Sequence, residues 1–550
     1  MTATSFPRPS SSQSSTIWWC LLGLALLSVV LPIAAVRYLP LNDYPFHLAR
    51  IFILADIDGP IFSRFYEPGN WLLPNIALDA VGLAIAQITG PELAVRIFVG
   101  LALVLQLAGA AALHRAAHGR LSLWPLLALV PVYNGIVSYG FLNYLFGTGL
   151  ALLAAAGWLA YRDRPWVLPF GFIAACVLML CHMEAFGVFA VIVGMAEIAR
   201  AWTTARGSAD SLAALIPAAV RLAIAALPFL AAIALFLALS PTSNDLDGGF
   251  RYGGFRIANL IYGPVFALAS SVPMLDLLAA GLAGGLFCWA WWSGRLQISV
   301  PVLLGALTLA AASVLLPRYM LGSDFGNVRL APAAVMVAIA AIDIRPATGL
   351  RRDALTLVLV ATIAVLAISR SVGLTMVWTK WESRITPIIA DFAELPEGAM
   401  IFKAMHGPLP VLMPNSAEAR AAWKPSIKHV ASYAAIDKPR FVPAIYTDPH
   451  KQPLNIAPAF QAIKDLQGQN PFEVETPADL SALVTKLRDF EREHGNQDVT
   501  DRYISVVGSA APFTWDPPAG TTLVRRSPRH LLLRLDPPPG LPQGQTPTHR

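Results

Sequence analysis

The sequence is poor in charge. Of its 550 residues, only 13% are Asp, Glu, Lys or Arg, whereas 56% are hydrophobic. Soluble globular domains carry about 25% charged residues, so this composition excludes an ordinary soluble protein and indicates a polytopic membrane protein. The formal net charge of +6 comes without a dense Lys/Arg run or an interleaved aromatic-basic pattern. That absence excludes a nucleic-acid-binding surface and favours a basic bias in the loops that flank membrane-spanning segments.

Cysteine and nucleotide-binding motifs are also scarce. The four cysteines lie in or beside apolar runs and do not repeat a metal-ligand spacing; they are Cys20, Cys176, Cys181 and Cys288. They predict neither a disulfide framework nor a zinc site. The sequence has no Walker motif, no Gly-rich dinucleotide motif, no Gly-x-Ser-x-Gly motif and no repeat of fixed period. These absences argue against ATP-coupled transport, dinucleotide chemistry and a serine nucleophile.

Long apolar runs fill the chain as far as about residue 372. The first, residues 17–36, is long enough to cross the hydrocarbon core as a helix. It follows a Ser-rich tail, residues 1–15, which we predict to be disordered and cytoplasmic. Arg8 is the only basic residue of this tail, so a retained first helix is favoured over a cleaved signal peptide. We therefore predict a transmembrane domain over residues 16–372, built from about 11 to 13 transmembrane or re-entrant apolar segments.

The remainder of the chain has a different character, because the long apolar runs end and Pro, Lys, Asp and Glu become common. The segments GAMIFKAM, RYISVVGSAA and HLLLRLDP predict strands, and DLSALVTKLRDFEREHG predicts an amphipathic helix. Residues 373–535 are therefore expected to form a small soluble α/β domain outside the cytoplasm. Residues 536–550, which are rich in Pro, are expected to be a disordered tail.

Short basic loops set the expected orientation, because Lys and Arg accumulate on the cytoplasmic side. Such loops lie at residues 114–120, 161–165, 199–208 and 344–353. With these loops inside, the outer segments are the first outer loop at residues 37–70, the turns at residues 138–144 and 181–184, the segments at residues 241–256 and 317–327, and the tail. Two full crossings within residues 71–113 would conflict with this orientation, so residues 71–88, and similarly residues 257–271, are expected to be interfacial or re-entrant. The expected location is the inner membrane of a bacterial cell.

The first outer loop begins with LNDYPFHLAR, residues 41–50, which places three ionisable groups beside a membrane span. Pro45 suits the first turn of a helix, and Asp43 stands where a side chain caps one. On such a helix His47 and Arg50 share a face, because they are three residues apart. Asp43 is therefore either a helix cap or a general base for an acceptor hydroxyl, with His47 or Arg50 neutralising a leaving phosphate.

A short motif in this loop resembles a known enzyme family. DYPFHLAR, after a first transmembrane helix, is similar to the Asp-x-Pro-x-Tyr/His pattern, ending in Arg, of the GT-C glycosyltransferases. These integral membrane enzymes use sugars linked to polyprenyl phosphate. The likeness covers roughly the first 200 residues, and Gly90, Glu92 and Arg96 resemble the family's Gly-x-x-Glu-x-x-x-Arg turn with one residue fewer between Gly and Glu.

The resemblance implies roles for the residues of this loop. Asp43 takes the place of the family's catalytic aspartate, which deprotonates or orients the acceptor, and His47 and Arg50 support it. Tyr44 stands where the family often has a second acidic residue, which argues against a metal ion bridged by two carboxylates. The implied partners are a polyprenyl-phosphate-linked sugar, an envelope acceptor and membrane lipids, with no nucleic acid. No cofactor or metal ligand is predicted, and a divalent metal ion is left open.

The other outer segments supply candidates for substrate binding. These residues share an outer position and a group suited to a phosphate or a sugar, and they are Arg50, His182, Glu184, Arg251, Arg256, Arg318, Tyr319, Asp324 and Arg329. Arginine suits phosphate because its planar donors bind two oxygens at once. Alternatively, these arginines meet lipid headgroups or carboxylates, and His182 and Glu184 form a local hydrogen-bonded pair.

Two other classes of function stay open. A lipid or solute transporter would line a translocation path with the same charges. A noncatalytic envelope-assembly protein would bind a partner through its tail and would use Asp43 only to cap a helix. A single outer cavity that holds Asp43, Arg318 or Arg329 and an apolar groove would favour the glycosyltransferase.

Overall fold

The structure is a computed structural model of the chain. It describes residues 12–207, 211–242, 249–252, 259–320, 323–345, 352–407, 427–494, 499, 501–508 and 513–537. Arg256, one of the predicted site residues, lies outside the described residues. The chain divides by its internal contacts into two compact units. The helical unit comprises residues 1–41, 70–380 and 413–425, and the sheet unit comprises residues 42–69, 381–412 and 426–550.

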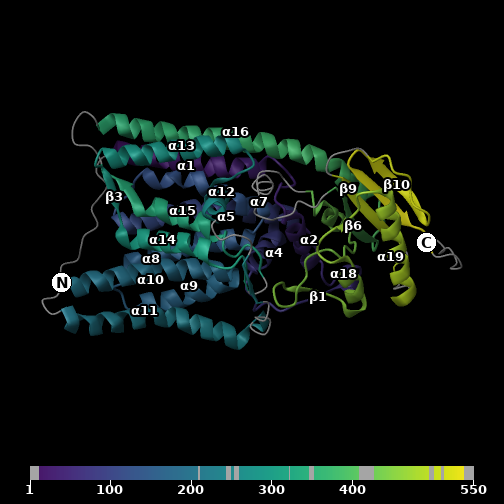
Figure 1. The fold of residues 1–550 in the computed structure, drawn as a ribbon, viewed down its shortest axis with the longest axis horizontal. Helices are drawn as coiled ribbons and strands as arrows, with labels where there is room; N and C mark the ends of the chain where they lie inside the picture. The colour runs from purple at the N-terminus through teal and green to yellow at the C-terminus, as the bar shows by residue number, and fades with distance from the viewer. Residues whose placement is uncertain are drawn as a thin grey trace. The chain divides into compact units, whose positions relative to one another are not determined.

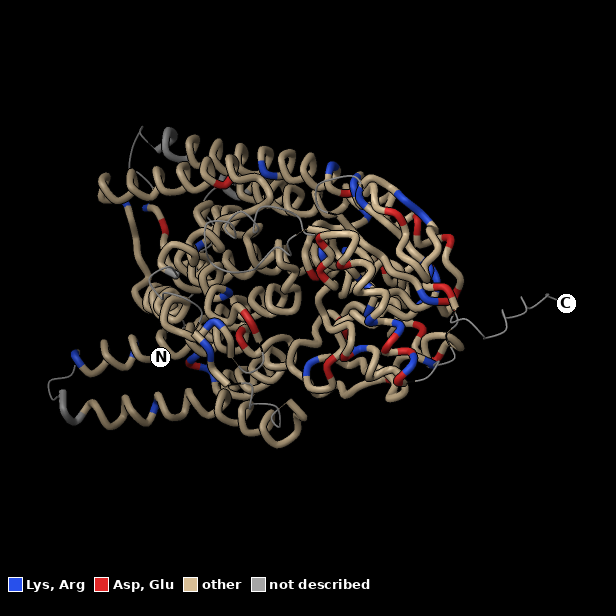
Figure 2. Tube along the Cα trace, turned by 45° about the vertical axis from the view of Figure 1, so that its right-hand side comes forward, with Lys and Arg blue, Asp and Glu red and all other residues tan. Residues whose placement is uncertain are grey.

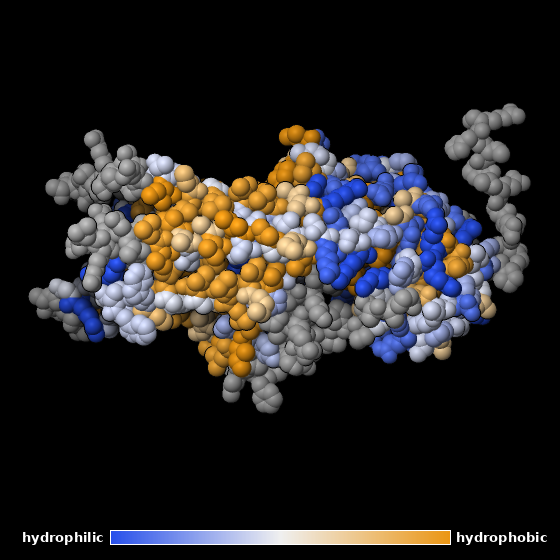
Figure 3. Space-filling model, turned by 90° about the horizontal axis from the view of Figure 1, so that it is seen from above, coloured by the Kyte–Doolittle hydropathy of each residue, from blue (hydrophilic) through white to orange (hydrophobic). Residues whose placement is uncertain are grey.

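Long apolar helices build the helical unit (Figure 1). Helices satisfy their own backbone polar groups, which is the condition for crossing hydrocarbon. Figure 3 shows a largely hydrophobic surface over these helices, and Figure 2 shows few charged residues along them. In the described part of the chain, seven helices are long and apolar enough to cross a membrane, namely α1 (Ser12–Ala34), α5 (Pro91–His118), α8 (Leu142–Tyr161), α10 (Met183–Arg206), α11 (Ser211–Leu239), α13 (Pro273–Trp292) and α16 (Arg352–Ala393). The predicted class of helical polytopic membrane protein is confirmed.

Shorter apolar helices lie between the long ones. They are α4 (Ala77–Thr89), α9 (Val167–Cys181), α12 (Asn259–Leu268), α14 (Val300–Leu315) and α15 (Leu330–Ala341). At about 1.5 Å per residue, the 13 residues of α4 extend roughly 20 Å, less than the hydrocarbon thickness of about 30 Å. Gly90, at φ +79°, ends α4, and α5 begins at Pro91. The two apolar stretches of residues 71–113 thus become one short and one long helix, which supports the expectation that one of them does not cross.

Two pairs of short strands lie at the two ends of α14 in the helical unit. Strand β3 (Leu296–Ile298) pairs with β5 (Ile342–Ile344), and Arg120 Nε donates to Asp343 Oδ2 over 2.7 Å, so three loops meet at one end. At the opposite end of α14, β2 (Phe250–Arg251) pairs with β4 (Tyr319–Met320). The side of the membrane that each group faces stays a prediction.

Small residues let α5 and α8 pack closely. A Cβ atom at Gly109 of α5 would lie 2.7 Å from Leu152 Cβ, and one at Gly149 of α8 would lie 2.6 Å from Leu105 Cβ. Real Cβ atoms are not found at such separations, so the glycines permit this approach. Close backbone approach at small residues is a usual way to join helices in a membrane, where lipid competes with apolar side chains.

A five-stranded sheet forms the centre of the sheet unit (Figure 1). Its order is β10 (Thr521–Ser527), β11 (His530–Leu535), β9 (Arg502–Gly508), β6 (Met400–His406) and β8 (Phe472–Glu473). Strand β6 runs parallel to β9 and β8, whereas β9, β11 and β10 are antiparallel neighbours. Strands β6 and β9 are buried along almost their whole length, as expected for apolar central strands. Helix α19 (Pro477–His494) covers the sheet unit with one apolar face.

The predicted strands and helix of the tail are present as β6, β9, β11 and α19. Helix α16 passes through residue 372 without interruption and ends at Ala393. Its last turns fasten to the sheet through a buried polar row, in which Asp391 Oδ2 lies 2.7 Å from His530 Nδ1 and Ser505 Oγ lies 3.0 Å from His530 Nε2. Ser505 and His530 are fully buried, so this Ser-His-Asp row joins α16 to two strands and is closed to substrate.

The segment at residues 42–69 is built into the sheet unit, although about 310 residues separate it from the next segment of that unit. Helix α2 (Tyr44–Ala55) packs against the 3₁₀ helix η4 (Val430–Ala435). After α3 (Phe62–Phe65), strand β1 (Tyr66–Pro68) pairs with β7 (Leu454–Ile456). Phe65 stacks on Phe441 with ring centroids 4.8 Å apart. The first outer loop therefore brings Asp43 into the same compact unit as the carboxyl-terminal strands.

Candidate functional site

Asp43 stands at the N-cap position of α2, and Pro45 lies in the first turn, as the sequence predicted. In the described first turn, however, the Asp43 side chain makes no capping hydrogen bond. Asn42 Nδ2 donates to Asp43 Oδ1 over 2.6 Å, and 28% of the Asp43 side chain is exposed. The position is that of a cap, but the geometry directs the carboxylate to other partners and leaves it accessible.

His47 and Arg50 share a face of α2, as their spacing predicted. Arg50 Nη2 lies 3.2 Å from His47 Nδ1, and only 1% of Arg50 is exposed. Arg50 is therefore a buried side chain of α2, and its predicted role in substrate binding stays a prediction. Tyr446 lies near enough for the charges of Asp43 and Arg50 to act on its pKa, which burial raises.

Two residues from the carboxyl-terminal part of the chain face Asp43. His429 Nε2 lies 3.9 Å from Asp43 Oδ1, and Lys403 Nζ lies 3.1 Å from His429 Nδ1. Lys403 belongs to β6, and His429 precedes η4. The Phe46 ring packs against the His429 imidazole, with the two planes tilted by 38° and the centroids 4.1 Å apart, and Lys403 Nζ lies 4.7 Å from the centroid of the Phe46 ring. We call Asp43, Phe46, Lys403 and His429 the Asp43 cluster.

Burial controls the charge of the basic groups in this cluster. It lowers the pKa of Lys403 well below the ordinary value, and the nearby charge of Lys428 lowers that pKa further. Burial also lowers the pKa of His429 well below 6.5, assisted by the charges of Lys403 and Lys428. Asp43 acts in the opposite direction on the pKa values of both lysines. His429 is therefore neutral at neutral pH and presents a neutral imidazole to Asp43.

A second group of predicted residues meets in the helical unit, where His182 separates α9 from α10. Arg329 Nη1 lies 2.9 Å from His182 Nε2, and Arg329 Nη2 donates to the Asp324 carbonyl over 2.6 Å. Glu184 Oε1 lies 3.7 Å from Arg329 Nη1, and the guanidinium lies 4.1 Å from the Phe141 ring centroid. We call His182, Glu184 and Arg329 the Arg329 cluster. It joins Arg329 to His182 and Glu184, which lie in a different outer segment of the sequence.

The remaining predicted residues of the helical unit also have partners. Arg318 forms a bidentate pair with Asp324, with Nε to Oδ1 at 2.8 Å and Nη2 to Oδ2 at 3.1 Å. Arg251 lies over the Tyr319 ring, 4.2 Å from its centroid. The alternative in which a loop arginine pairs with a carboxylate therefore describes Arg318 in this structure. A phosphate would have to displace or join Asp324.

The predicted residues thus fall into one cluster in each unit. Asp43, His47 and Arg50 lie in the sheet unit, and the others that the structure describes lie in the helical unit. A single cavity that unites Asp43 with Arg318 or Arg329 stays a prediction. Sequence reasoning missed Lys403 and His429, because a lone lysine in a strand and a lone histidine before a short helix carry no motif.

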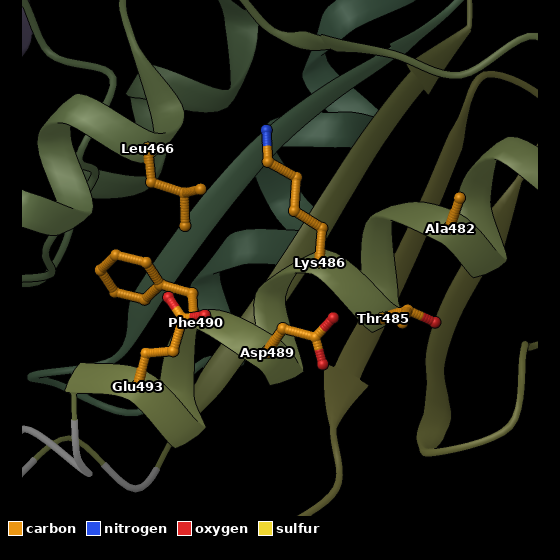
Figure 4. A pocket seen from close by; sticks show the side chains of 7 residues that line it. All are labelled: Leu466, Ala482, Thr485, Lys486, Asp489, Phe490 and Glu493. Carbon is orange, nitrogen blue, oxygen red and sulfur yellow. The ribbon is translucent and has the colours of Figure 1, made fainter.

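Metal ligands and pockets are a separate question. Within the described residues, no three His, Cys, Asp or Glu side chains come together as a possible metal site. One surface pocket of the sheet unit lies between α18 (Gln461–Gln467) and α19, and Figure 4 shows its seven lining residues. They contribute Lys486, Asp489 and Glu493 beside apolar side chains, and none is a predicted site residue. This pocket supplies no chemistry to the Asp43 cluster.

Comparisons with known proteins relate the chain to one fold. No family model and no curated protein sequence matches it. The crystal structure of ArnT from Cupriavidus metallidurans bound to undecaprenyl phosphate matches 97% of this chain and 100% of its own, with 11% sequence identity and a TM-score of 0.54. The apo structure of the same protein matches 96% of this chain and 100% of its own, with 12% identity and a TM-score of 0.52. This chain therefore has the fold of ArnT, a GT-C glycosyltransferase, in agreement with the resemblance in its first outer loop.

Proposed function

We propose that this protein is a membrane glycosyltransferase that transfers a sugar from a polyprenyl-phosphate donor to an acceptor of the cell envelope. Asp43 acts as the general base, and the reaction takes place on the extracytoplasmic side of the inner membrane. The observation that carries the proposal is the setting of Asp43, whose partly exposed carboxylate stands at a helix start without capping it. The ArnT fold supports the enzyme class, because ArnT was solved with undecaprenyl phosphate.

The chemistry follows from the position of the carboxylate. Asp43 takes the proton of an acceptor hydroxyl while that oxygen forms a bond to the anomeric carbon of the donor sugar. The bond between the anomeric carbon and the phosphate oxygen breaks, and its electron pair leaves with the polyprenyl phosphate. Lys428, which is half-buried and electrostatically coupled to Asp43, is placed to neutralise charge near the leaving group.

The Arg329 cluster supplies a second part of the proposal. Its guanidinium is held on three sides, by His182, by the Asp324 carbonyl and by the Phe141 ring. A guanidinium fixed in this way presents its charge without losing much conformational freedom on binding. We assign it to the recognition of the donor, either by contacting the lipid phosphate or by shaping the segment that carries Arg318.

The experiment is a transfer assay with the purified full-length protein in lipid nanodiscs. A panel of undecaprenyl-phosphate-linked sugars is incubated with an envelope lipid fraction, and release of undecaprenyl phosphate and labelling of acceptor are both measured. We expect release with at least one donor, and we expect Asp43→Asn to reduce it by roughly 10²-fold or more. Asp56→Asn is the matched control, because Asp56 is the carboxylate at the other end of α2.

Three outcomes of this experiment would contradict the proposal or favour one of the other two classes of function. Equal turnover of the wild type and Asp43→Asn would remove Asp43 as the base. Movement of labelled lipid across the nanodisc or vesicle bilayer without cleavage would support a transporter. No cleavage of any donor, together with retention of a protein partner by the full chain, would support the envelope-assembly function.

A further inference from the structure

We propose that Lys403 and His429 position the Asp43 carboxylate, with Lys403 holding the His429 imidazole in the tautomer whose Nε2–H faces Asp43. This inference rests on the proposed function for its catalytic consequence. Its structural part, the orientation and ionisation of Asp43, can be tested without any transfer reaction.

The tautomer follows from the partners on the two ring nitrogens. Lys403 Nζ lies 3.1 Å from His429 Nδ1 and also donates to the Gln469 carbonyl over 2.8 Å. The charge of Asp43 favours the ammonium form of Lys403. In that form Nζ can only donate, so Nδ1 is the acceptor and the ring proton belongs to Nε2. The opposite tautomer would turn the lone pair of Nε2 toward the carboxylate of Asp43, which electrostatics disfavours. Both partners of the ring therefore select the same tautomer.

The separation of 3.9 Å between His429 Nε2 and Asp43 Oδ1 is longer than a hydrogen bond. Hydrogen bonds of catalytic groups are often long without substrate and shorten in the reacting complex. The imidazole of His429 is held in place for this contact by Phe46, which comes from the helix that Asp43 precedes and packs against the imidazole. Helix α2 therefore carries both the carboxylate and the aromatic ring that fixes its partner.

Exposure assigns the roles within the cluster. The Asp43 side chain is 28% exposed, whereas the His429 side chain is 4% exposed and Lys403 is 1% exposed. A substrate can reach Asp43 but not the two basic residues behind it. Lys403 and His429 are therefore positioning residues, and Asp43 is the group that touches the acceptor.

A purely structural role for Lys403 is the alternative. Its backbone N–H donates to Gln467 Oε1, so the residue also helps to join β6 to α18. Arg440 offers a matched comparison, because it is a fully buried cation of the same unit. It donates to the carbonyls of Leu395 and Ala434, and no described contact joins it to α2. If Lys403 has only a structural role, its replacement should affect stability alone, as expected for Arg440. If Lys403 is a positioning residue, its replacement should also change the ionisation of Asp43.

The charges around Asp43 determine the direction of that change. Lys403 and Lys428 favour its ionised form, Tyr446 is coupled to it, and the Nε2–H of His429 faces it. Arg50 and His47 lie on the same helix, bonded to each other. Removing a donor or a cation from this set makes the carboxylate harder to ionise, so the pKa of Asp43 should rise.

The test labels Asp43 in the full-length protein with a hydrophobic carbodiimide, which reacts with protonated carboxyl groups. Labelling is carried out over a range of pH values, and mass spectrometry of the peptide that contains Asp43 measures its extent. We expect His429→Leu and Lys403→Met to raise the pH of half-maximal labelling by about one unit, as expected when a carboxylate loses a donor or a nearby cation. His429→Gln, whose amide nitrogen can replace Nε2–H, should restore the wild-type value. Lys403→Gln keeps a donor for His429 Nδ1 but loses the positive charge, so it should raise the pH of half-maximal labelling less than Lys403→Met does.

Arg440→Met is the control, and it should lower the unfolding temperature while leaving the labelling curve unchanged. An unchanged curve in His429→Leu or Lys403→Met, or the same shift in Arg440→Met, would overturn the proposal. His429→Gln keeps the proposal testable if the apolar variants do not fold, because a labelling curve shifted by about one unit in this variant, which retains a donor, would also overturn it. A shifted curve in a protein that cleaves no donor would refute the proposed function and leave the positioning intact.

Discussion

The two clusters of ionisable residues differ in how far their central charged side chains are exposed. In the Arg329 cluster the guanidinium meets a histidine, a carbonyl, a carboxylate and an aromatic ring, and only 7% of the Arg329 side chain is exposed. In the Asp43 cluster the carboxylate lies 3.9 Å from His429 Nε2 and is 28% exposed. Buried groups bonded to one another fix structure, whereas an accessible carboxylate beside held donors is suited to chemistry. This difference agrees with the proposed roles, which are positioning for the Arg329 cluster and proton transfer for Asp43.

The largest expected effect on stability follows from breaking the ion pair between Arg329 and Glu184 in the helical unit. Arg329→Met removes the partner of Glu184, so a buried carboxylate is left without its cation. We expect the free energy of unfolding to fall by about 3 to 5 kcal/mol, as for other buried pairs that lose one member. Chemical unfolding of the full chain in micelles measures this. A loss below about 1 kcal/mol would show that the pairing does not stabilise the helical unit.

The next effect concerns catalysis in the sheet unit. Asp43→Asn keeps the size of the side chain and its ability to cap α2, but it removes the proton acceptor. Turnover should fall by roughly 10²-fold or more, while the unfolding temperature stays near that of the wild type. Asp43→Ala should add a stability loss on the order of 1 kcal/mol if capping contributes. Near-normal turnover of the Asn variant would show that Asp43 is not the general base. The two clusters would then no longer differ in function.

A smaller effect is expected in the pH dependence of stability. Burial and the charges of Lys403 and Lys428 lower the pKa of His429 below 6.5, so below about pH 6.5 the unfolded chain binds a proton that the folded chain does not. Stability should therefore fall as the pH decreases from 6.5 toward 5. Unfolding temperatures between pH 5 and pH 8 measure this slope. His429→Gln should flatten it, and an equal slope in that variant would show that other groups control the response.

The smallest effect on stability is expected for the solvent-exposed ion pair of the helical unit. Arg318 pairs with Asp324, whose side chain is 48% exposed, so solvent screens the pair. Arg318→Lys should change the free energy of unfolding by less than about 1 kcal/mol. Donor binding should weaken more than the unchanged charge suggests, because the bidentate geometry is lost. Equal donor affinity, measured by titration with an undecaprenyl-phosphate sugar, would remove Arg318 from the site.

Local patterns in the sequence were sufficient for several features. The apolar runs predicted the membrane helices, because each helix must satisfy its backbone within one continuous segment. Pro45 predicted the first turn of α2, and the spacing of His47 and Arg50 predicted their shared face. Alternating and apolar stretches predicted β6, β9 and β11. Each of these features depends on neighbours within a few residues, which is what a linear pattern records.

Tertiary structure alone decided which residues surround Asp43. Lys403 and His429 lie more than 350 residues from it along the chain, and nothing in their local sequence marks them. They reach the carboxylate because residues 42–69 fold into the sheet unit, where β1 pairs with β7 and α2 packs on η4. Such long-range pairing is selected by the burial of apolar surface, as in the stacking of Phe65 on Phe441, and not by any spacing. The sequence determined that Asp43 stands at the start of a helix. The fold determined that the Asp43 side chain does not cap this helix, and that the His429 imidazole, bonded to Lys403, faces the carboxylate.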